Sequence, residues 1–229
     1  MPTNKRLIFV SLVAGMLPLL GLMRPEMEQA SHLVRDADII QLAQARRTDV
    51  NRTEGPHVGV DSGGTPYNQD YFVADRRPGS LLEIMERVHF NNDVFENFRA
   101  GRYEYAIPDV DFVLFRYPNH PRALQIMSAI AILRKQPSYA IDYYETALFL
   151  YPQYAITHAQ FGNYLVKIGV MDDGIARLKK AIELDPKLTA AYVWLAEAYY
   201  KKGDRKLGTE AAEQARKLGH KGVITGETG

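Results

Sequence analysis

The chain has 229 residues, of which 46% are apolar and 24% are charged. This balance is typical of a folded globular chain and excludes a disordered one. The 28 Lys and Arg residues nearly balance the 27 Asp and Glu residues, giving a formal net charge of +1. No overall electrostatic attraction to nucleic acid is therefore available. The absence of cysteine excludes disulfides, thiolate metal sites and cysteine nucleophiles.

An uncharged apolar run opens the chain. Lys5 and Arg6 precede the uncharged residues 7–23, and Arg24 closes the run. A membrane-spanning helix needs roughly 17–25 apolar residues, and no small-residue cleavage site follows this run. We expect residues 1–24 to be a single-pass membrane anchor, and the alternatives are a cleaved signal segment or a buried soluble helix. Its apolar contacts with lipid would come from Leu7, Ile8, Phe9, Leu12, Leu17, Leu19 and Leu20.

The basic residues before this run favour a cytoplasmic N-terminus. The rest of the chain would then lie on the extracytoplasmic, or periplasmic, side of the cell (inner) membrane. If the segment is cleaved, the chain would instead be secreted into the periplasm.

Two connecting segments come next. Residues 25–49 predict a juxtamembrane helix, capped by Ser31 and ending near Arg47, which is either a stalk or a docking helix for a membrane subunit. Residues 50–79 are rich in Gly, Pro, Asn and Asp and keep no period, which predicts a linker or extended strap. If this strap is ordered, Tyr67, Tyr71 and Phe72 would press it onto the body of the chain or onto a partner.

An internal repeat fills the C-terminal two thirds of the chain. Proline and glycine landmarks recur at one constant interval, namely Pro118, Pro152 and Pro186, and Gly101, Gly169 and Gly203, with Lys135 in the place of a glycine. Small residues recur in three phases of the same interval: Ala106, Ala140, Gly174 and Gly208; Ala147, Ala181 and Ala215; and Ser128, Gly162 and Ala196. Small side chains at such positions allow two antiparallel helices to cross closely.

This interval, about 34 residues, resembles the period of the tetratricopeptide repeat, a helix–turn–helix unit. The texts AIELDP at 181–186 and QFGNYLVKIG at 160–169 are similar to that family. The resemblance implies an all-α fold, a right-handed α-solenoid of helix–turn–helix repeats behind the N-terminal helix and the extended linker. The repeat domain would cover residues 80–222, leaving a tail at 223–229. Its units would be a degenerate repeat at 87–120 and full repeats at 121–154, 155–188 and 189–222.

The ends of the repeat domain depart from this pattern. Ser80 and Glu83 form a capping box, which predicts one helix from there to about Ala100. Pro108 requires the paired helix to start late or to kink. No separate capping helix is expected after residue 222, so the last helix would end the solenoid itself or contact another chain.

No pattern in the sequence carries catalytic chemistry. The six histidines are scattered, and no HExxH, GxSxG, GxGxxG or Walker pattern occurs. We therefore predict no catalytic residues, no metal and no cofactor, and we expect that the protein is not an enzyme.

The resemblance implies a concave surface lined by the first helix of each unit. The residues predicted to face a protein partner there are Asn91, Phe95, Phe98, Arg122, Gln125, Asn163, Lys167, Glu197 and Lys201. The alternative places Phe95 and Phe98 in the core of the degenerate unit. Relatives that bind acidic C-terminal peptides use a carboxylate clamp; Asn163 matches one clamp position, but Ala159 and Val193 replace polar or basic residues. The clamp is therefore expected to be absent.

These features predict a non-enzymatic protein–protein interaction scaffold. The leading hypothesis is a membrane-anchored accessory, structural or assembly subunit of a membrane protein complex, with its repeats on the extracytoplasmic side. Its partners would be other protein subunits, and the membrane through the N-terminal helix, with no nucleic acid and no small-molecule substrate. The alternative is a secreted, soluble periplasmic binding or assembly factor released by signal cleavage.

Overall fold

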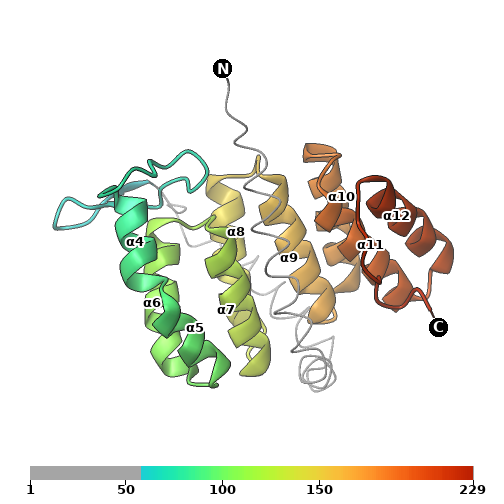
Figure 1. Cartoon of the computed structure of the whole chain (residues 1–229), viewed down its shortest axis with the longest axis horizontal. Coiled ribbons are helices and arrows are strands. Elements are labelled where there is room, and N and C mark those ends of the chain that lie inside the picture. Colours follow the sequence, from blue (N-terminus) through green and yellow to red (C-terminus); the bar gives the residue numbers. More distant parts are fainter. Residues whose placement is uncertain (1–57, 229) are drawn as a thin grey trace, which may run out of the picture.

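The computed structural model describes residues 58–228, which form a row of helices running from α4 at one end to α12 at the other (Figure 1). The first unit contains α4 (Leu81–His89), α5 (Asn92–Arg99) and α6 (Tyr103–Arg116). Three helix pairs follow: α7 (Pro121–Leu133) with α8 (Ser138–Leu150), α9 (Ala155–Lys167) with α10 (Met171–Leu184), and α11 (Thr189–Lys202) with α12 (Arg205–Lys217). The predicted anchor and juxtamembrane helix lie outside the described residues.

The period of the repeat sets the register of the helix pairs. Helices α7, α9 and α11 begin at Pro121, Ala155 and Thr189, which are equivalent positions in successive repeats. The turns within the pairs need a left-handed residue, and Gly101, Gly169 and Gly203 have φ angles of 71°, 92° and 88°. Lys135 adopts the same conformation with φ 57°, so the fold imposes the geometry of the turn even where the glycine is missing.

Small residues let the paired helices cross closely, as the sequence predicts. The clearest case is the crossing of α9 and α10, where a Cβ atom on Gly162 would lie 2.7 Å from the carbonyl oxygen of Gly174. A Cβ atom on Gly174 would in turn lie 2.8 Å from the carbonyl oxygen of Gly162. The described chain is therefore all-helical, apart from one short hairpin, and is built as a solenoid of helix pairs.

The first unit differs from the prediction of one helix between Ser80 and about Ala100. Helix α4 ends at His89, with Phe90 as its C-cap. Asn91 then caps a new helix by accepting a hydrogen bond from the amide of Asp93 at 2.9 Å. Ser80 caps α4 by accepting from the amide of Glu83, but the carboxylate of Glu83 accepts from the amide of Gly79 rather than from that of Ser80. An Asn at this position ends one helix and starts the next because its side chain competes for backbone amides.

Pro108 lies inside α6, which starts at Tyr103. The expectation of a late start was therefore wrong. Pro108 is the sixth residue of the helix, so its missing amide removes the hydrogen bond to the carbonyl four residues earlier, that of Glu104. The side chain of Pro108 is exposed, and the helix continues past it.

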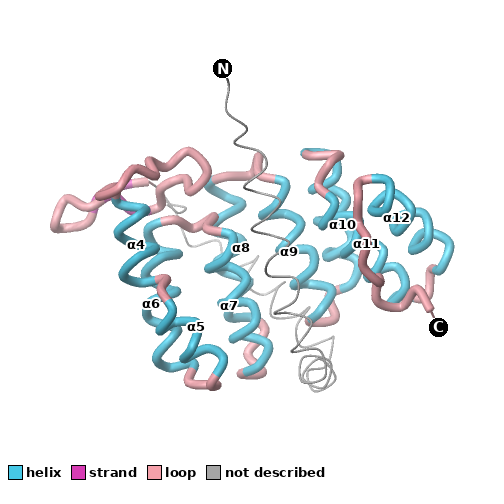
Figure 2. Tube along the Cα trace, in the orientation of Figure 1, coloured by secondary structure: helices cyan, strands magenta, loops and turns pink. Residues whose placement is uncertain are grey.

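The strap, here residues 58–79, packs on the body of the chain and crosses one end of it (Figure 2). Strands β1 (Gly59–Val60) and β2 (Pro66–Tyr67) form a short antiparallel hairpin. The buried guanidinium of Arg116 donates to the carbonyls of Thr65 and Pro66 and pairs with the carboxylate of Asp61 at 2.5 Å. This hydrogen bond lowers the pKa of Asp61. The strap was expected to contact either the body of the chain or a partner, and its described residues contact the body.

The second half of the strap is fixed by α7 and its N-terminal loop. The amide of Tyr71 donates to Asn119 Oδ1 at 2.9 Å, and the ring of Tyr71 packs on His120 at 4.4 Å between centroids. His120 is fully buried and caps α7, with Nδ1 accepting from the amide of Ala123 and Nε2 facing the carboxylate of Glu86 at 3.2 Å. Burial lowers the pKa of His120, so the ring is neutral and carries its proton on Nε2.

The segment after α12, residues 218–228, includes the described part of the tail and covers the side of the last helix pair. From here on, the tail means these residues. Ile224 is fully buried against α11 and α12. Thr225 donates to the carboxylate of Glu197 on α11, and Glu227 pairs with Arg216 on α12. Helix α12 ends the row of helices within the described chain, as expected, and this segment without helix adds cover along the side of the last pair.

Helix α9 joins the two halves of the core. One cluster of buried apolar side chains extends from Phe90 to Val170, and a second extends from Ala159 to Ile224. Phe161 and Leu165 of α9 belong to the first cluster, whereas Ala159 and Val166 belong to the second. Since α9 is buried on both sides, its remaining polar face is held in a fixed orientation.

Candidate functional site

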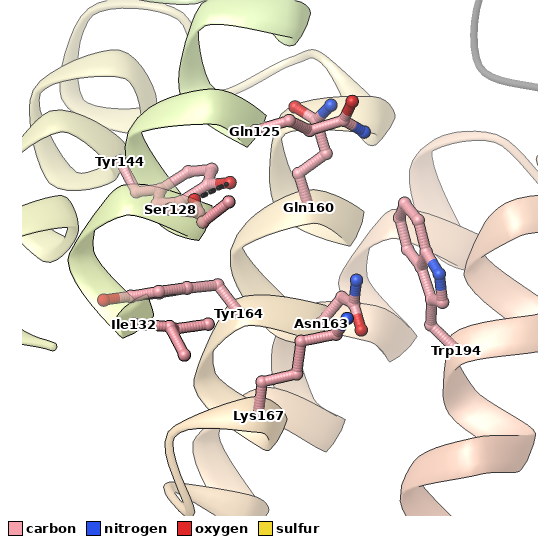
Figure 3. A pocket seen from close by; sticks show the side chains of 10 residues that line it. Gln125, Ser128, Ile132, Tyr144, Gln160, Asn163, Tyr164, Lys167 and Trp194 are labelled. Atoms are coloured by element: carbon pink, nitrogen blue, oxygen red, sulfur yellow. Dashed lines mark hydrogen bonds between the residues drawn. The ribbon is translucent and has the colours of Figure 1, made fainter. Parts of the chain in front are cut away.

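A shallow open hollow lies over α7, α9 and α11, and its cavity volume is about 20 Å³. Figure 3 shows the side chains that surround it, with Tyr144 and Ile132 on one side and Trp194 on the other. The first helices of three successive units supply most of this lining. We call this region the groove; its lining residues are Gln125, Ser128, Ala129, Ile132, Tyr144, Gln160, Asn163, Tyr164, Lys167 and Trp194.

One wall of the groove is a stack of rings. Tyr144 packs face to face on Phe161, with centroids 4.9 Å apart, and on Tyr164 at 5.9 Å. Its hydroxyl hydrogen-bonds with Ser128 Oγ at 2.9 Å, and Ser128 donates to the carbonyl of Leu124. The hydroxyl of Tyr164 donates to the carbonyl of Pro137. Burial raises the pKa of both tyrosines above the usual range, so this wall is neutral and rigid.

A buried polar atom without a partner lies in the groove. Gln160 is 3% exposed, and its Nε2 donates to the carbonyl of Pro121 at 3.1 Å. Its Oε1 has no hydrogen-bond partner within the described part of the chain. A buried acceptor left unpaired costs about 1–3 kcal/mol. Gln125 and Gln160 both line the hollow (Figure 3), so the groove offers amide groups to a ligand that carries N–H or O–H donors.

The structure brings three predicted residues together in the groove, which are Gln125, Asn163 and Lys167. All three side chains are half-buried. Gln160 and Trp194 also line it, although sequence reasoning did not select them. Gln160 lies three residues before Asn163, so helical spacing places both on one face, and this signal could have found it.

The two predicted residues on α11 are engaged within the chain. Lys201 donates to the carbonyl of Val166 on α9 at 3.0 Å. Glu197 accepts a hydrogen bond of 2.7 Å from Thr225 Oγ1. Both residues therefore help to hold the last unit and the tail in place.

The residues predicted on the first unit are placed differently from expectation. Phe98 is 8% exposed and belongs to the core, so the prediction that it faces outward was wrong. Asn91 caps α5. Phe95 is half-buried, and the guanidinium of Arg122 lies over its ring at 4.9 Å and over that of Phe90 at 5.3 Å. Sequence reasoning failed here because the break at Asn91 turns α5 relative to a single continuous helix.

The described residues contain neither a metal-binding cluster nor a helix fit to cross a membrane. No three His, Asp or Glu side chains of residues 58–228 gather in a way that could hold a metal ion. The helices α4–α12 are also too short or too polar for a membrane span. The predicted anchor lies outside this part of the chain.

The comparisons with known proteins concern the repeats. Residues 162–203 match the family model described as the TPR repeat. This segment, from α9 to α11, is therefore similar to the tetratricopeptide repeat. No curated protein matches the chain in sequence.

Several solved structures are similar to this chain. One is YrrB, described as a TPR protein with an unusual peptide-binding site, at 19% identity and a TM-score of 0.44. That match covers 55% of this chain and 65% of YrrB, so it spans slightly less than two thirds of that protein. A second is MamA from Desulfovibrio magneticus RS-1, residues 41 to the end, at 23% identity, a TM-score of 0.46 and coverages of 60% and 75%. Another MamA structure matches at 20% identity, a TM-score of 0.46 and coverages of 60% and 78%.

Proposed function

We propose that this protein is a non-enzymatic scaffold that binds a polypeptide segment of a partner protein in the groove over α7, α9 and α11. The observation that carries the proposal is Gln160 Oε1, a buried acceptor in the groove without a partner in the described residues. A bound segment with an N–H or O–H donor would satisfy it and recover much of its desolvation cost.

The chemistry of the groove suits a peptide better than a small substrate. Amide side chains such as Gln125 and Asn163 can both donate to and accept from a peptide backbone. Trp194 and Ile132 lie on opposite sides of the hollow and, being 4% and 6% exposed, add a small apolar area to it. Lys167 adds positive charge at one end of the groove.

We further propose that the scaffold acts as an accessory, structural or assembly subunit of a membrane protein complex, with its repeats on the extracytoplasmic side. The support is the sequence alone, in which Lys5 and Arg6 precede the apolar residues 7–23. The alternative, a secreted periplasmic factor, rests on cleavage of the same segment. The intact mass of the purified native protein separates the two, because a cleaved chain would begin between Arg24 and Ser31.

The groove is tested by co-purification from detergent-solubilised membranes of the native host. Gln125→Ala combined with Asn163→Ala should lower the recovery of the partner, with affinity reduced about tenfold or more, which corresponds to a loss of about 1.4 kcal/mol or more for the pair. Both side chains are half-buried, so the melting temperature should change little. A matched control is Glu210→Ala on α12, which removes an exposed side chain far from the groove. Unchanged affinity in a folded double variant would show that the partner binds elsewhere.

A further inference from the structure

The second helices of the units, α6 and α8, expose aromatic side chains to solvent. Tyr105 and Phe115 of α6 are 65% and 44% exposed, and Tyr139 and Phe149 of α8 are 37% and 64% exposed. Large aromatic side chains usually lie in the core or in an interface. Phe115 stacks on Tyr67 of the strap, with ring centroids 5.2 Å apart, so one of its faces is already covered. The other three rings need an explanation other than packing within the core of the unit.

The four positions are equivalent in the repeat. Tyr139 lies one repeat period after Tyr105, and Phe149 lies one period after Phe115. The same two positions hold Asp173 and Glu183 in α10, and Leu207 and Lys217 in α12. The repeat fold does not require an aromatic residue at either place, so the first two units carry these rings for a reason of their own.

Contacts between side chains show that the two helices present one surface. The hydroxyl of Tyr143 on α8 donates to Asp111 Oδ1 on α6 at 2.6 Å. The ring of Tyr139 packs edge to face on that of Tyr143 at 5.7 Å. Along each helix, the two exposed rings are ten residues apart, or about 15 Å. The rings thus frame an area about three turns of helix long, with Asp111 and Tyr143 inside it.

This framed surface is acidic. Helix α6 contributes Glu104 and Asp111, and its one basic residue, Arg116, is buried and paired with Asp61. The third acidic residue of α6, Asp109, instead hydrogen-bonds with His89 of α4. Helix α8 adds Asp142 and has no Lys or Arg, whereas its Glu145 lines another hollow with Arg177 and Lys180. The raised pKa of Tyr143 keeps its hydroxyl protonated, so it remains a donor to the Asp111 carboxylate.

Helix α12 has the opposite charge. It carries Arg205, Lys206, Arg216 and Lys217 against Glu210 and Glu213. The acidic, aromatic character is therefore confined to the first two units within the described chain, and we define the outer face of α6 and α8 as the aromatic–acidic face. Its residues are Tyr105, Asp111, Phe115, Tyr139, Tyr143 and Phe149.

We propose that the aromatic–acidic face is a second interaction surface, which binds an arginine- and lysine-bearing polypeptide segment of a partner protein. Charge complementarity selects this occupant, because carboxylates attract cations and the faces of exposed Tyr and Phe rings add cation–π attraction. Guanidinium groups suit the surface best, since they stack on rings and donate to a carboxylate at the same time. This surface is separate from the groove, so the protein can hold two partner segments at once.

The test measures binding of a fluorescent hexa-arginine peptide to the full chain at low salt by anisotropy, with hexa-lysine and hexa-glutamate peptides for comparison. We expect hexa-arginine to bind more tightly than hexa-lysine, and hexa-glutamate not to bind. Tyr105→Ser with Phe149→Ser should weaken hexa-arginine binding about tenfold, because each exposed cation–π contact contributes roughly half a decade or more. Asp111→Asn should weaken it as well, and both effects should shrink as salt rises.

The matched control is Leu184→Ser, which removes a 37% exposed apolar side chain from α10. It should leave hexa-arginine binding unchanged, and melting curves should show that all variants are folded. Equal binding by the wild type and the Tyr105→Ser/Phe149→Ser variant would overturn the proposal. It would also be overturned if the wild type bound no hexa-arginine but formed dimers that this double variant abolishes, because the face would then be an interface between copies of this chain.

Discussion

Replacing Gly162 by alanine tests how strongly the closest helix crossing determines the stability of the solenoid. The added Cβ atom would lie 2.7 Å from the carbonyl oxygen of Gly174, 2.8 Å from Leu178 Cγ and 3.0 Å from the amide nitrogen of Leu178. Two of these three atoms belong to the backbone of α10, so they cannot turn aside as the end of a side chain can. Helices α9 and α10 must therefore separate by several tenths of an ångström.

Two opposing effects decide the sign of the change. Forcing an extra methyl group into a packed site costs about 1–3 kcal/mol. Alanine in place of glycine inside a helix recovers about 0.5–1 kcal/mol. We expect Gly162→Ala to lower the free energy of unfolding by about 1 kcal/mol, near the middle of the roughly 0–2.5 kcal/mol that the difference of these two effects allows. Urea denaturation followed by circular dichroism measures this change.

The equivalent position on α11 provides the control. Position 196 is occupied by a fully buried alanine, so this crossing accommodates a methyl group, and Ala196→Gly should destabilise the protein through the loss of that packing and of helix propensity. If Gly162→Ala instead raised the free energy of unfolding by about 0.5–1 kcal/mol, helix propensity alone would govern this site. The proposed close crossing of α9 and α10 would then be refuted.

Three other changes test the turns, the tail and the buried histidine. Lys135→Gly should stabilise the protein by roughly 0.5–1 kcal/mol. A left-handed conformation costs an L-residue about 1–2 kcal/mol, whereas glycine loses only more conformational entropy on folding. An unchanged midpoint of urea denaturation would contradict the strain at Lys135. Ile224→Ala should cost about 2 kcal/mol or more, as for other fully buried isoleucines, and no loss would mean that the tail does not pack. Because burial lowers the pKa of His120 below its unfolded value, its contribution to stability should be present above pH ~6.5 and should decline as the pH falls below that value. His120→Asn, which keeps an N-cap acceptor, should make stability depend less on pH between 7 and 5, and an unaltered profile would show that His120 does not titrate there.

The repeat core was predictable from the sequence because its landmarks have local physical causes. A glycine at a fixed place in each unit marks a turn, and the structure shows that Lys135, which takes the place of one of these glycines, adopts the same left-handed conformation. Small residues such as Gly162 mark a helix crossing, since no larger side chain fits between two backbones. These signals depend on residue type and spacing alone, so they can be read without the tertiary structure.

The first unit and the tail were not predictable in the same way. Asn91 breaks a stretch whose apolar pattern is also compatible with one helix, and the shift in phase moves Phe98 from the surface to the core. In the tail, Ile224 is buried whereas its apolar neighbour Val223 is 80% exposed, so no pattern of apolar residues indicates which of the two is buried. Its place is determined by the open side of α11 and α12, which only the folded chain reveals.

The candidate site was predictable in part. Gln125, Asn163 and Lys167 share the exposed stripe of the first helices, and helical spacing identified them. Trp194 was missed because it is largely buried, and burial in a groove cannot be distinguished from burial in a core by sequence pattern alone. Gln160 was missed although its spacing from Asn163 places both residues on one face of α9. The contacts of the strap show the same limit, because Arg116 meets Asp61 across 55 residues of sequence.

Photo-crosslinking from the groove tests the central claim most directly. A benzophenone amino acid at position 125 of the full chain, expressed in the native host and irradiated, should attach to one defined partner protein, and mass spectrometry should locate the bond within one segment of it. The same probe at position 210, on the exposed side of α12, should give no such product. A partner captured equally from both positions, or from position 210 alone, would contradict the assignment of the groove over α7, α9 and α11 as the site of polypeptide binding.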